Sequence, residues 1–382
     1  MKRTGLAALA LALLVGLLPG KVRAAGPEVT AKSAVLMDVQ SGTLLCGQNE
    51  HEQLAPASVT KVMTMLLIME AIDSGRIGWG DTVTASETAA SKGGSQIYLK
   101  AGETMSVSDM VKSIAVSSAN DCACAMAELI AGSEPAFVEM MNQRAKELGM
   151  NDTNFVNCTG LDDDPAAKDH KTSAYDIALM SRELLKNHPD IKKYTTIWMD
   201  TVRDGAFGLA NTNKLVRFYS GCTGLKTGFT SGAGYCLSAS AQREDLELIA
   251  VVMGSATSQD RFSACKSLLD YGFANYALYT PELPEAVSVP VKLGAVDLAQ
   301  AVPAGEAALL VDKGQRSAIE TQVTLEESVT APVSAGQRLG TLTVKHGDQV
   351  LTQVPLVAAE PVTKLTTLDL LVQILRSVAM AK

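Results

Sequence analysis

The sequence predicts an α+β fold, in which a larger domain is followed by a small all-β domain and a terminal amphipathic helix. Strand-like segments lie near both ends of the larger domain, at about 32–46 and 225–254, and the chain between them has mainly helical spacing of apolar residues. Strands at the two ends of a domain can pair in one antiparallel sheet when helices form the insertion between them. After Tyr279, prolines separate short alternating segments, which is typical of a separate β-domain.

In chain order, the first elements are expected to be a strand at 32–38, a turn at Gln40-Ser41-Gly42 and a returning strand at 43–46. Pro56 then opens an apolar helix at 58–72. Further helices are expected at 108–132, with a polar interruption at 117–121, and at 135–148, 175–185 and 260–273. Antiparallel strands are expected at 225–230, 235–241 and 246–254, and β-domain strands at 286–293, 307–311, 319–325 and 337–345. These segments define a larger domain at 25–279 and a β-domain at 280–362.

The N-terminal segment 1–24 has the pattern of an export signal. Lys2 and Arg3 supply a positive end, residues 5–18 are apolar, and Val22-Arg23-Ala24 ends in a small-residue cleavage site. The alternative is an uncut membrane anchor, but the apolar run is short for a bilayer span and is followed at once by proline and glycine. We therefore expect the mature chain to begin near Ala25.

The C-terminal segment 363–382 is predicted to form an amphipathic helix with one apolar side. That side comprises Leu365, Leu368, Leu371, Val372, Leu375 and Val378. Such a helix can lie in the plane of a membrane or dock on its own β-domain, and we expect the first. Because the segment has few basic residues, membrane attachment would depend mainly on apolar burial.

Charge and cysteine content exclude several classes of function. The formal net charge is −8, and removal of the four basic residues of the leader takes it to −12, which disfavours binding to nucleic acid. The seven cysteines include no Cys-x-x-Cys pair and no neighbouring histidine cluster, so neither a metal nor a cofactor is expected. Most are expected to be small core residues. A disulfide between Cys122 and Cys124 is disfavoured within a helix, and a bridge elsewhere is left open.

Three short motifs carry the chemistry. Ser58-Val59-Thr60-Lys61 puts a hydroxyl and an ammonium on one face of a helical turn, where a desolvated lysine can accept the serine proton. Ser118-Ala119-Asn120 follows in the polar interruption between two helices, and Lys226-Thr227-Gly228 begins a strand. Alone, the second motif could be a helix cap and the third a strand bulge. A second Ser-x-x-Lys, from Ser263 to Lys266, precedes no partner motif and is interpreted as part of a helix surface.

With these motifs in this order, the sequence resembles the serine penicillin-binding proteins and the related β-lactamases. It is most similar to the low-molecular-mass D-alanyl-D-alanine carboxypeptidases, through Asn157-Cys158-Thr159-Gly160-Leu161, Leu225 to Thr230 and Leu268 to Phe273. The resemblance implies a β-lactamase/transpeptidase-like catalytic domain, an antiparallel sheet with a helical insert. The sequence departs from the subgroup around the motifs, at Cys122, Cys158, Cys222 and Thr223.

The resemblance also implies the reaction, removal of the terminal D-alanine from a peptidoglycan pentapeptide ending in D-alanyl-D-alanine. Ser58 would attack the carbonyl between the two D-alanines, Lys61 would take its proton, and Ser118 would relay a proton to the departing amine. Asn120 would orient the substrate amide and Lys226 would supply a positive field.

The same resemblance assigns the remaining substrate contacts to the third motif and its surroundings. Backbone N–H groups of Ser58 and Phe229 would form the oxyanion hole. Thr227 and Arg261 would hold the terminal carboxylate, and Gly228 belongs to the same substrate-binding strand. β-Lactam antibiotics are expected as covalent inhibitors. The expected location is the outer face of the bacterial cytoplasmic membrane or the extracytoplasmic space.

Two other functions are compatible with these motifs. A β-lactamase would need a glutamate-activated water, and the loop at 157–172 contains no glutamate. A non-catalytic penicillin-sensing or wall-binding protein would be expected to have lost a motif residue, whereas all three motifs are complete. The same loop is a candidate rim of the site, and its lone His170 is interpreted as a surface residue. The sequence has no zinc-protease helix, phosphate loop or Gly-x-Ser-x-Gly elbow.

Overall fold

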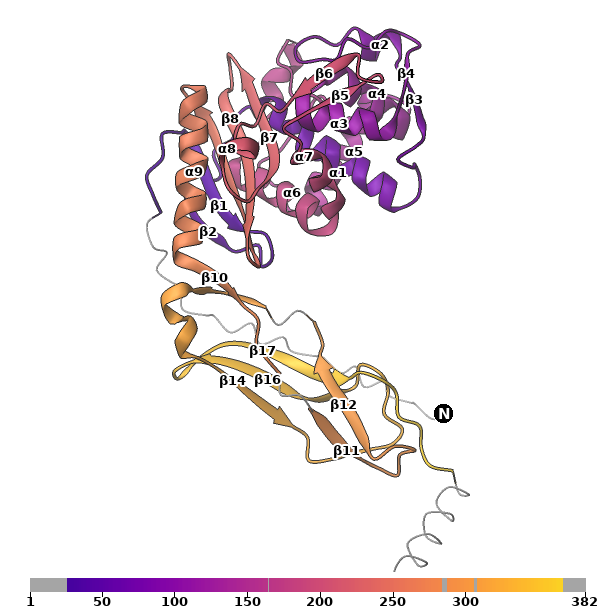
Figure 1. Cartoon of the computed structure of the whole chain (residues 1–382), viewed down its shortest axis with the longest axis vertical. Helices are drawn as coiled ribbons and strands as arrows, with labels where there is room; N and C mark the ends of the chain where they lie inside the picture. The colour runs from indigo at the N-terminus through magenta and orange to yellow at the C-terminus, as the bar shows by residue number, and fades with distance from the viewer. Residues whose placement is uncertain (1–25, 164, 284–286, 306–307, 367–382) are drawn as a thin grey trace, which may run out of the picture.

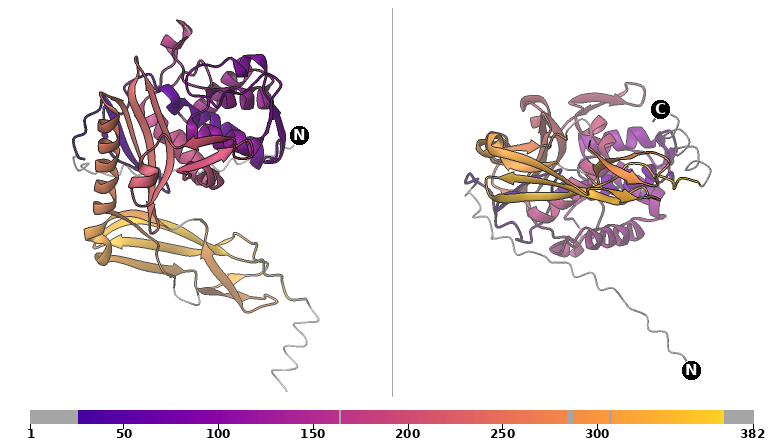
Figure 2. Two further views of the ribbon diagram at one scale, coloured as in Figure 1. Left: turned by 45° about the horizontal axis from the view of Figure 1, so that its top comes forward. Right: turned by 90° about the horizontal axis from the view of Figure 1, so that it is seen from below.

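The structure is a computed structural model that describes residues 26–163, 165–283, 287–305 and 308–366 (Figure 1). The predicted export signal at 1–24 lies outside the described residues, and so does the predicted amphipathic helix at 363–382 beyond Thr366. The larger domain and the β-domain lie one below the other, and helix α9 and strand β10 lead from the first to the second (Figures 1 and 2). In the described part of the chain, no helix is long and apolar enough to cross a membrane.

The larger domain is built on a five-stranded antiparallel sheet with the order β2-β1-β9-β8-β7. The first strand pairs with a strand near the end of the domain, so that Val35 lies opposite Val251. The prediction that the terminal strands share one sheet is therefore confirmed. Strand β7 is at the edge of the sheet. The strands are β1 (Ser33–Asp38), β2 (Leu44–Gln48), β7 (Cys222–Thr230), β8 (Gly234–Arg243) and β9 (Leu246–Ser255).

Helices cover both faces of this sheet, because successive strand residues point to opposite sides. Val35 and Val251 belong to the core shared with α1, whereas Leu36 and Val252 belong to the core shared with α9. Figure 1 shows α9 on one side and the other long helices on the opposite side. The helices are α1 (Lys61–Asp73), α2 (Glu87–Ala90), α3 (Val107–Ser117), α4 (Asn120–Ala131), α5 (Glu134–Glu147), α6 (Ala174–Asn187), α7 (Lys192–Thr195), α8 (Leu215–Phe218) and α9 (Ser258–Asn275).

Helix α1 is apolar on all sides and lies in the centre of the larger core. Its residues from Lys61 to Met69 are all buried, because the sheet packs on one side and α3, α4, α5 and α6 on the others. Such a helix offers a dry environment to any polar group at its start. Short connecting elements complete the domain: the 3₁₀ turns η1 (Ala57–Thr60), η2 (Pro165–Asp169) and η3 (Pro189–Ile191), and the ribbons β3 (Thr82–Thr84) with β4 (Thr104–Ser106) and β5 (Met199–Val202) with β6 (Phe207–Ala210).

The β-domain is a six-stranded sheet with the order β14-β16-β17-β12-β11-β15 and its own apolar core. Strand β10 (Tyr276–Tyr279) continues directly from α9 and pairs with β13 (Leu309–Asp312) in a separate ribbon. This pairing joins the end of α9 to the β-rich part of the chain. The remaining elements are β11 (Ser288–Lys292), β12 (Leu298–Pro303), η4 (Lys313–Ala318), β14 (Ile319–Leu325), β15 (Val329–Thr330), β16 (Arg338–His346) and β17 (Gln349–Ala358).

Candidate active site

Ser58 and Lys61 meet where the turn η1 passes into α1. The Lys61 ammonium donates a hydrogen bond of 3.0 Å to Ser58 Oγ and another of 2.8 Å to the Thr159 carbonyl. Ser58 is half-buried, whereas Lys61 is completely buried. The predicted sharing of one helical face is therefore present, and the hydroxyl is the partner of a lysine that water does not reach.

This burial changes the acid–base properties of Lys61. Loss of hydration lowers the pKa of Lys61 from its ordinary value of 10.5 to about 7, although the negative charge of Asp121 opposes the shift. Near neutral pH a large fraction of Lys61 is then uncharged, and its nitrogen lies 3.0 Å from Ser58 Oγ, close enough to accept the hydroxyl proton. The pair can therefore act as nucleophile and base.

The loop from Asn157 to Leu161 packs directly on the turn before Ser58. A Cβ at Gly160 would lie 1.9 Å from the Ala57 carbonyl oxygen, so only glycine fits this contact. Asn157 closes the loop, because its Oδ1 accepts the backbone N–H groups of Thr159 and Gly160 at 3.1 and 2.6 Å. These contacts give a physical reason for the Asn-Cys-Thr-Gly-Leu segment: it presents the Thr159 carbonyl to Lys61.

Ser118 and Asn120 are buried and keep unpaired polar atoms. Ser118 ends α3 in the left-handed conformation (φ 63°), and its Oγ has no hydrogen-bond partner among the described residues. Asn120 donates through Nδ2 to the Gly93 carbonyl at 2.7 Å, and its Oδ1 also lacks a partner in the described structure. Buried polar groups normally have partners, so these two atoms are available to a bound ligand.

Strand β7 brings the third motif against the Ser58 turn. A Cβ at Gly228 would lie 2.6 Å from the Pro56 carbonyl oxygen and 3.0 Å from the Ser58 nitrogen. Lys226 is buried and donates to the Thr227 carbonyl at 3.0 Å. Burial, with the positive charges of Lys61 and Arg261, lowers the pKa of Lys226 well below its usual value. The backbone of the edge strand β7 is therefore in direct contact with the backbone at Ser58.

The outer part of the third motif has well-defined contacts. The Thr227 hydroxyl donates to Thr212 Oγ1 at 2.7 Å. The Phe229 ring is 53% exposed and stacks on Tyr235, with ring centroids 4.3 Å apart. Sequence reasoning did not find Thr212, because no motif marks it.

Arg261 supports the same strand from α9. It is 8% exposed, and its Nη1 donates to the carbonyls of Gly228 at 2.9 Å and Cys236 at 3.4 Å. Its Nε has no partner among the described residues. The structure therefore brings Arg261 beside the motif strand, with the backbone of that strand as its nearest acceptor.

His170 is buried, so its interpretation as a surface residue is wrong. Its Nδ1 accepts the Val156 backbone N–H at 3.1 Å, so in the neutral ring Nε2 carries the proton and donates to Thr60 Oγ1 at 2.9 Å. Thr60 in turn donates to the Ala57 carbonyl at 2.8 Å. Burial, with the charges of Lys171 and Lys61, lowers the pKa of His170 to about 4. His170 therefore holds the backbone just before Ser58.

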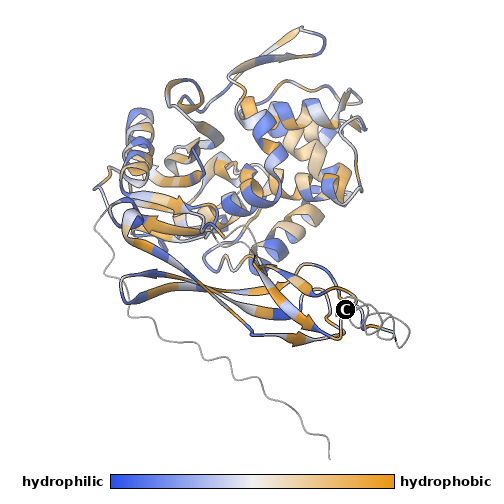
Figure 3. Cartoon of the chain, turned by 60° about the horizontal axis from the view of Figure 1, so that its bottom comes forward, coloured by the Kyte–Doolittle hydropathy of each residue, from blue (hydrophilic) through white to orange (hydrophobic). Residues whose placement is uncertain are grey.

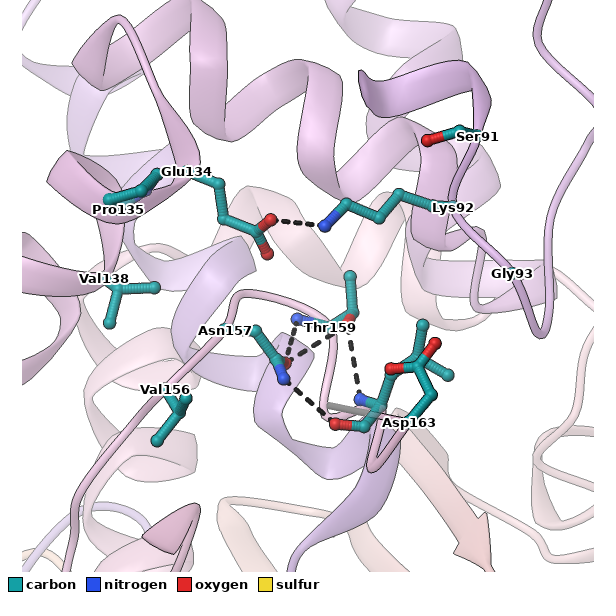
Figure 4. A pocket seen from close by; sticks show the side chains of 11 residues that line it. Ser91, Lys92, Gly93, Glu134, Pro135, Val138, Val156, Asn157, Thr159 and Asp163 are labelled. Atoms are coloured by element: carbon teal, nitrogen blue, oxygen red, sulfur yellow. Dashed lines mark hydrogen bonds and ion pairs between the residues drawn. The ribbon is translucent and has the colours of Figure 1, made fainter. Parts of the chain in front are cut away.

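A polar pocket of about 390 Å³ is lined in part by the loop residues Asn157, Thr159 and Leu161 (Figure 4). An ion pair between Lys92 and Glu134 forms part of its wall, and Glu134 also accepts the backbone N–H and the thiol of Cys158, each at 3.1 Å. Glu134 is an acid in contact with this loop, but both of its oxygens are engaged. All seven cysteines are free thiols.

One further group of ligand-type side chains has a different explanation. Glu70, Glu183 and His188 lie close enough together to hold a metal ion. Arg144, however, binds Glu70 at 2.7 Å and Glu183 at 2.6 Å. The guanidinium neutralises both carboxylates, so we interpret the group as an ion-pair network.

Comparison with known proteins assigns this arrangement to a class and a family. A family model described as D-alanyl-D-alanine carboxypeptidase, peptidase S11, matches residues 21–257, and one described as penicillin-binding protein 5, C-terminal domain, matches residues 284–364. The class is therefore that of the serine penicillin-binding peptidases. The chain belongs to the peptidase S11 family of D-alanyl-D-alanine carboxypeptidases.

Individual relatives agree over most of the chain. D-alanyl-D-alanine carboxypeptidase DacF of Bacillus subtilis is 44% identical over 341 residues, which is 87% of this chain and 86% of that protein. The crystal structure of penicillin binding protein 5 from Haemophilus influenzae has a TM-score of 0.74 at 31% identity and covers 88% of this chain and 99% of that one. Penicillin-Binding Protein D2 from Listeria monocytogenes, in its ampicillin-bound form, has a TM-score of 0.56 at 32% identity and covers 65% of this chain and 99% of that one. The predicted family and enzyme class are confirmed.

Proposed function

We propose that the protein removes the terminal D-alanine from peptidoglycan pentapeptides through an acyl-enzyme on Ser58. The observation that carries the proposal is the 3.0 Å contact between Ser58 Oγ and a fully buried Lys61 whose pKa is about 7. A hydroxyl becomes a good nucleophile only when a base can take its proton at the working pH. Lys61 meets this requirement near neutral pH without any third side chain.

In the proposed reaction, Ser58 Oγ attacks the carbonyl between the two D-alanines while its proton passes to Lys61. The C–N bond then breaks, and Ser118 relays the proton held by Lys61 to the leaving amine, so that free D-alanine departs and Lys61 is again neutral. The unpaired Ser118 Oγ supports this role, and the unpaired Asn120 Oδ1 supports the binding of a substrate amide N–H. Water then hydrolyses the ester and restores Ser58. No cofactor takes part in this scheme.

Stabilisation of the tetrahedral intermediate is assigned to backbone N–H groups of Ser58 and Phe229. The Gly228 contact supports this assignment, because it keeps β7 within van der Waals distance of the Ser58 backbone. A side chain at Gly228 would push these two backbone segments apart.

We assign the terminal carboxylate of the substrate to the Thr227 hydroxyl and to Lys226, because a bound carboxylate would favour the charged form of this buried lysine. Direct binding by Arg261 stays a prediction. Its hydrogen bond to the Gly228 carbonyl also suits a supporting role, in which it holds the strand that carries Thr227. Charge-assisted hydrogen bonds to a carboxylate contribute about 1.5–3 kcal/mol each.

We further propose that β-lactams acylate Ser58, since a relative at 32% identity has been crystallised with ampicillin bound. The segment 1–24 is proposed to direct export, with residues 25–279 as the catalytic domain and 280–362 as the β-domain. Residues 363–382 are proposed to associate with the outer face of the cytoplasmic membrane. Deletion of residues 365–382 should then move the mature protein from the membrane to the soluble fraction with little loss of peptidase activity.

The test of the proposed function is the release of D-alanine from a pentapeptide acid and from its C-terminal amide. If the carboxylate is bound beyond the scissile bond, the amide should be cleaved with roughly tenfold lower kcat/KM, and Thr227→Val should narrow this gap. Equal turnover of both peptides would contradict the proposed carboxylate-binding site, but it would remain consistent with the serine mechanism. If the protein releases no D-alanine but hydrolyses a penicillin rapidly, it is a β-lactamase. If a penicillin acylates it and no turnover follows with either compound, it is a sensor.

A further inference from the structure

One end of the β-domain carries exposed apolar side chains on the turn between β11 and β12. Leu293, Val296 and Leu298 are 48%, 53% and 56% exposed. Isolated apolar residues are common on protein surfaces, but three exposed ones between Leu293 and Leu298, in the turn and the first residue of β12, form a local apolar cluster. We call residues 292–298 the tip. Gly294 pairs with Lys364 in an isolated bridge, so the tip lies beside the end of the described chain, in the β-domain that Figure 3 brings forward and colours by hydropathy.

The tip is held in a strained conformation that displays its leucine. Leu293 has a φ of +59°, a region that disfavours a branched side chain and favours glycine or asparagine. Neighbouring Gly294 is packed so closely that a Cβ would lie 2.7 Å from Val291 Cγ1 and 3.0 Å from Val362 Cγ1. An apolar side chain kept in an unfavourable backbone conformation and exposed to water points to a function for that side chain.

The tip is also fixed to the start of the C-terminal segment. The Leu365 backbone N–H donates to the Leu293 carbonyl at 2.9 Å, and the Ala295 N–H donates to the Thr363 carbonyl at 2.8 Å. The following residues, 367–382, have an apolar stripe in the sequence and carry only Asp369, Arg376 and Lys382 as charged residues. Any surface that this segment binds must therefore come close to the tip.

The charges of the region suit a lipid surface. Two basic residues, Lys292 and Lys364, flank the apolar residues, and one acidic residue, Asp297, lies within the tip. Basic residues beside exposed apolar side chains match the anionic headgroups and acyl chains of a phospholipid membrane. A single weakly basic amphipathic segment binds membranes marginally, and stable attachment generally takes two signals. The tip can provide the second signal.

We propose that the tip inserts Leu293, Val296 and Leu298 into the surface of an anionic phospholipid membrane, next to the C-terminal segment. This interaction is separate from the peptidase reaction. It rests on one part of the proposed function, the export of the protein to the outer face of the membrane. It gives the β-domain a fixed orientation on the membrane, in addition to the tether of the terminal segment.

The first test uses Val296→Trp in the mature full-length chain, with Val350→Trp as the matched control. Val350 is also exposed (41%), but it follows the β16–β17 turn, whose His346 pairs with Ile319 next to η4. Lys313 of η4 bonds to the Phe273 carbonyl of α9, so this control lies at the end of the β-domain that faces the larger domain.

With vesicles of phosphatidylglycerol and phosphatidylethanolamine, the emission of Val296→Trp, after subtraction of the wild-type emission from Trp79 and Trp198, should shift to the blue and be quenched by acyl-brominated lipid. Val350→Trp should show neither change. The proposal is overturned if Val296→Trp stays unquenched while the protein binds the vesicles. It is also overturned if the emission is already blue-shifted without lipid and stays unquenched, because the terminal segment would then cover the tip.

The second test measures vesicle partitioning of the triple variant Leu293→Asn, Val296→Thr and Leu298→Thr. Asparagine suits the left-handed conformation at Leu293, and threonine suits the strand at Leu298, so folding should be preserved. The partition coefficient should fall roughly tenfold, whereas Val350→Thr should leave it unchanged. Unchanged partitioning of the triple variant overturns the proposal. D-alanine release from a soluble pentapeptide, measured on the same samples, tests the proposed function separately, and all variants should retain it.

Discussion

The chain contains two Ser-x-x-Lys pairs with identical spacing in very different surroundings. Ser58 and Lys61 stand at the start of a buried helix, against the edge strand β7 and the Thr159 carbonyl. Ser263 and Lys266 are both exposed on the outer side of α9, and Ser263 Oγ accepts a hydrogen bond from Gln259. The spacing puts a hydroxyl and an ammonium on one face in both cases. Only the first pair is removed from water, and this removal converts the lysine into a base near neutral pH.

The largest difference in activity should lie between the variants of Ser58 and Ser263. Ser58→Ala should abolish covalent labelling by a fluorescent penicillin and lower D-alanine release by about 10⁴-fold or more, because the nucleophile is lost. Ser263→Ala should match the wild type in both assays, since its hydroxyl faces water. Labelling and mass spectrometry of the intact protein measure both variants. If Ser58→Ala is still labelled, Ser58 is not the nucleophile, and the proposed difference between the two Ser-x-x-Lys pairs is contradicted.

The second-largest difference in acylation rate should lie between the variants of Lys61 and Lys266. Lys61→Met should slow acylation by about 10²- to 10⁴-fold, the usual contribution of a general base, and Lys266→Met should have no effect. Because the pKa of Lys61 is about 7, the wild-type acylation rate should rise as the pH increases through about 7 and then level off. Below that pH the lysine is protonated and cannot accept the serine proton. Stopped-flow acylation by a chromogenic cephalosporin measures the profile, and a rate independent of pH in this range would contradict the role of Lys61.

A glycine substitution tests whether the close contact with β7 matters. Gly228→Ala adds a methyl group 2.6 Å from the Pro56 carbonyl oxygen, so the strand must move away from Ser58. A shift of about 1 Å in such a site costs on the order of 10²-fold in rate. Gly208→Ala is the matched control, because its Cβ would meet nothing within 4 Å. If kcat/KM of Gly228→Ala equals that of the control, the contact has no catalytic importance.

The smallest effect on activity should come from His170, which acts through Thr60 and the Ala57 carbonyl. His170→Phe should lower kcat several-fold with little change in KM, and His170→Gln should restore part of it. Exposed His51→Phe serves as the control. Because burial lowers the pKa of His170 to about 4, the unfolded chain binds a proton between pH 6.5 and 4 that the folded chain does not.

Stability should therefore decrease as the pH falls through this range, by roughly 3 kcal/mol for this residue. Urea unfolding of the wild type and His170→Phe at several pH values measures the difference. An identical pH dependence in the two proteins would show that His170 does not remain neutral in the fold.

Much of the architecture could be predicted because local patterns reflect local physics. Alternation at 246–254 and helical spacing at 260–273 come from the need to bury one face of each element, and both elements are present as β9 and α9. The polar interruption at 117–121 ends α3 and begins α4, as expected for residues that favour helix termini. The order of the three motifs identified the family and the enzyme class, since the roles proposed for the motifs each need particular side chains.

The sequence by itself thus determined the motifs, their order and the family, while the tertiary structure decided the surroundings of each motif residue. Burial of Lys61, the 2.6 Å approach of Gly228 and the carbonyl of Thr159 depend on segments more than 90 residues apart in the chain. The same holds for His170, which has no motif and contacts Thr60 only because the loop after Cys158 folds back onto η1. A pKa and a hydrogen-bond partner depend on which distant atoms exclude water from a group, and no local pattern records that.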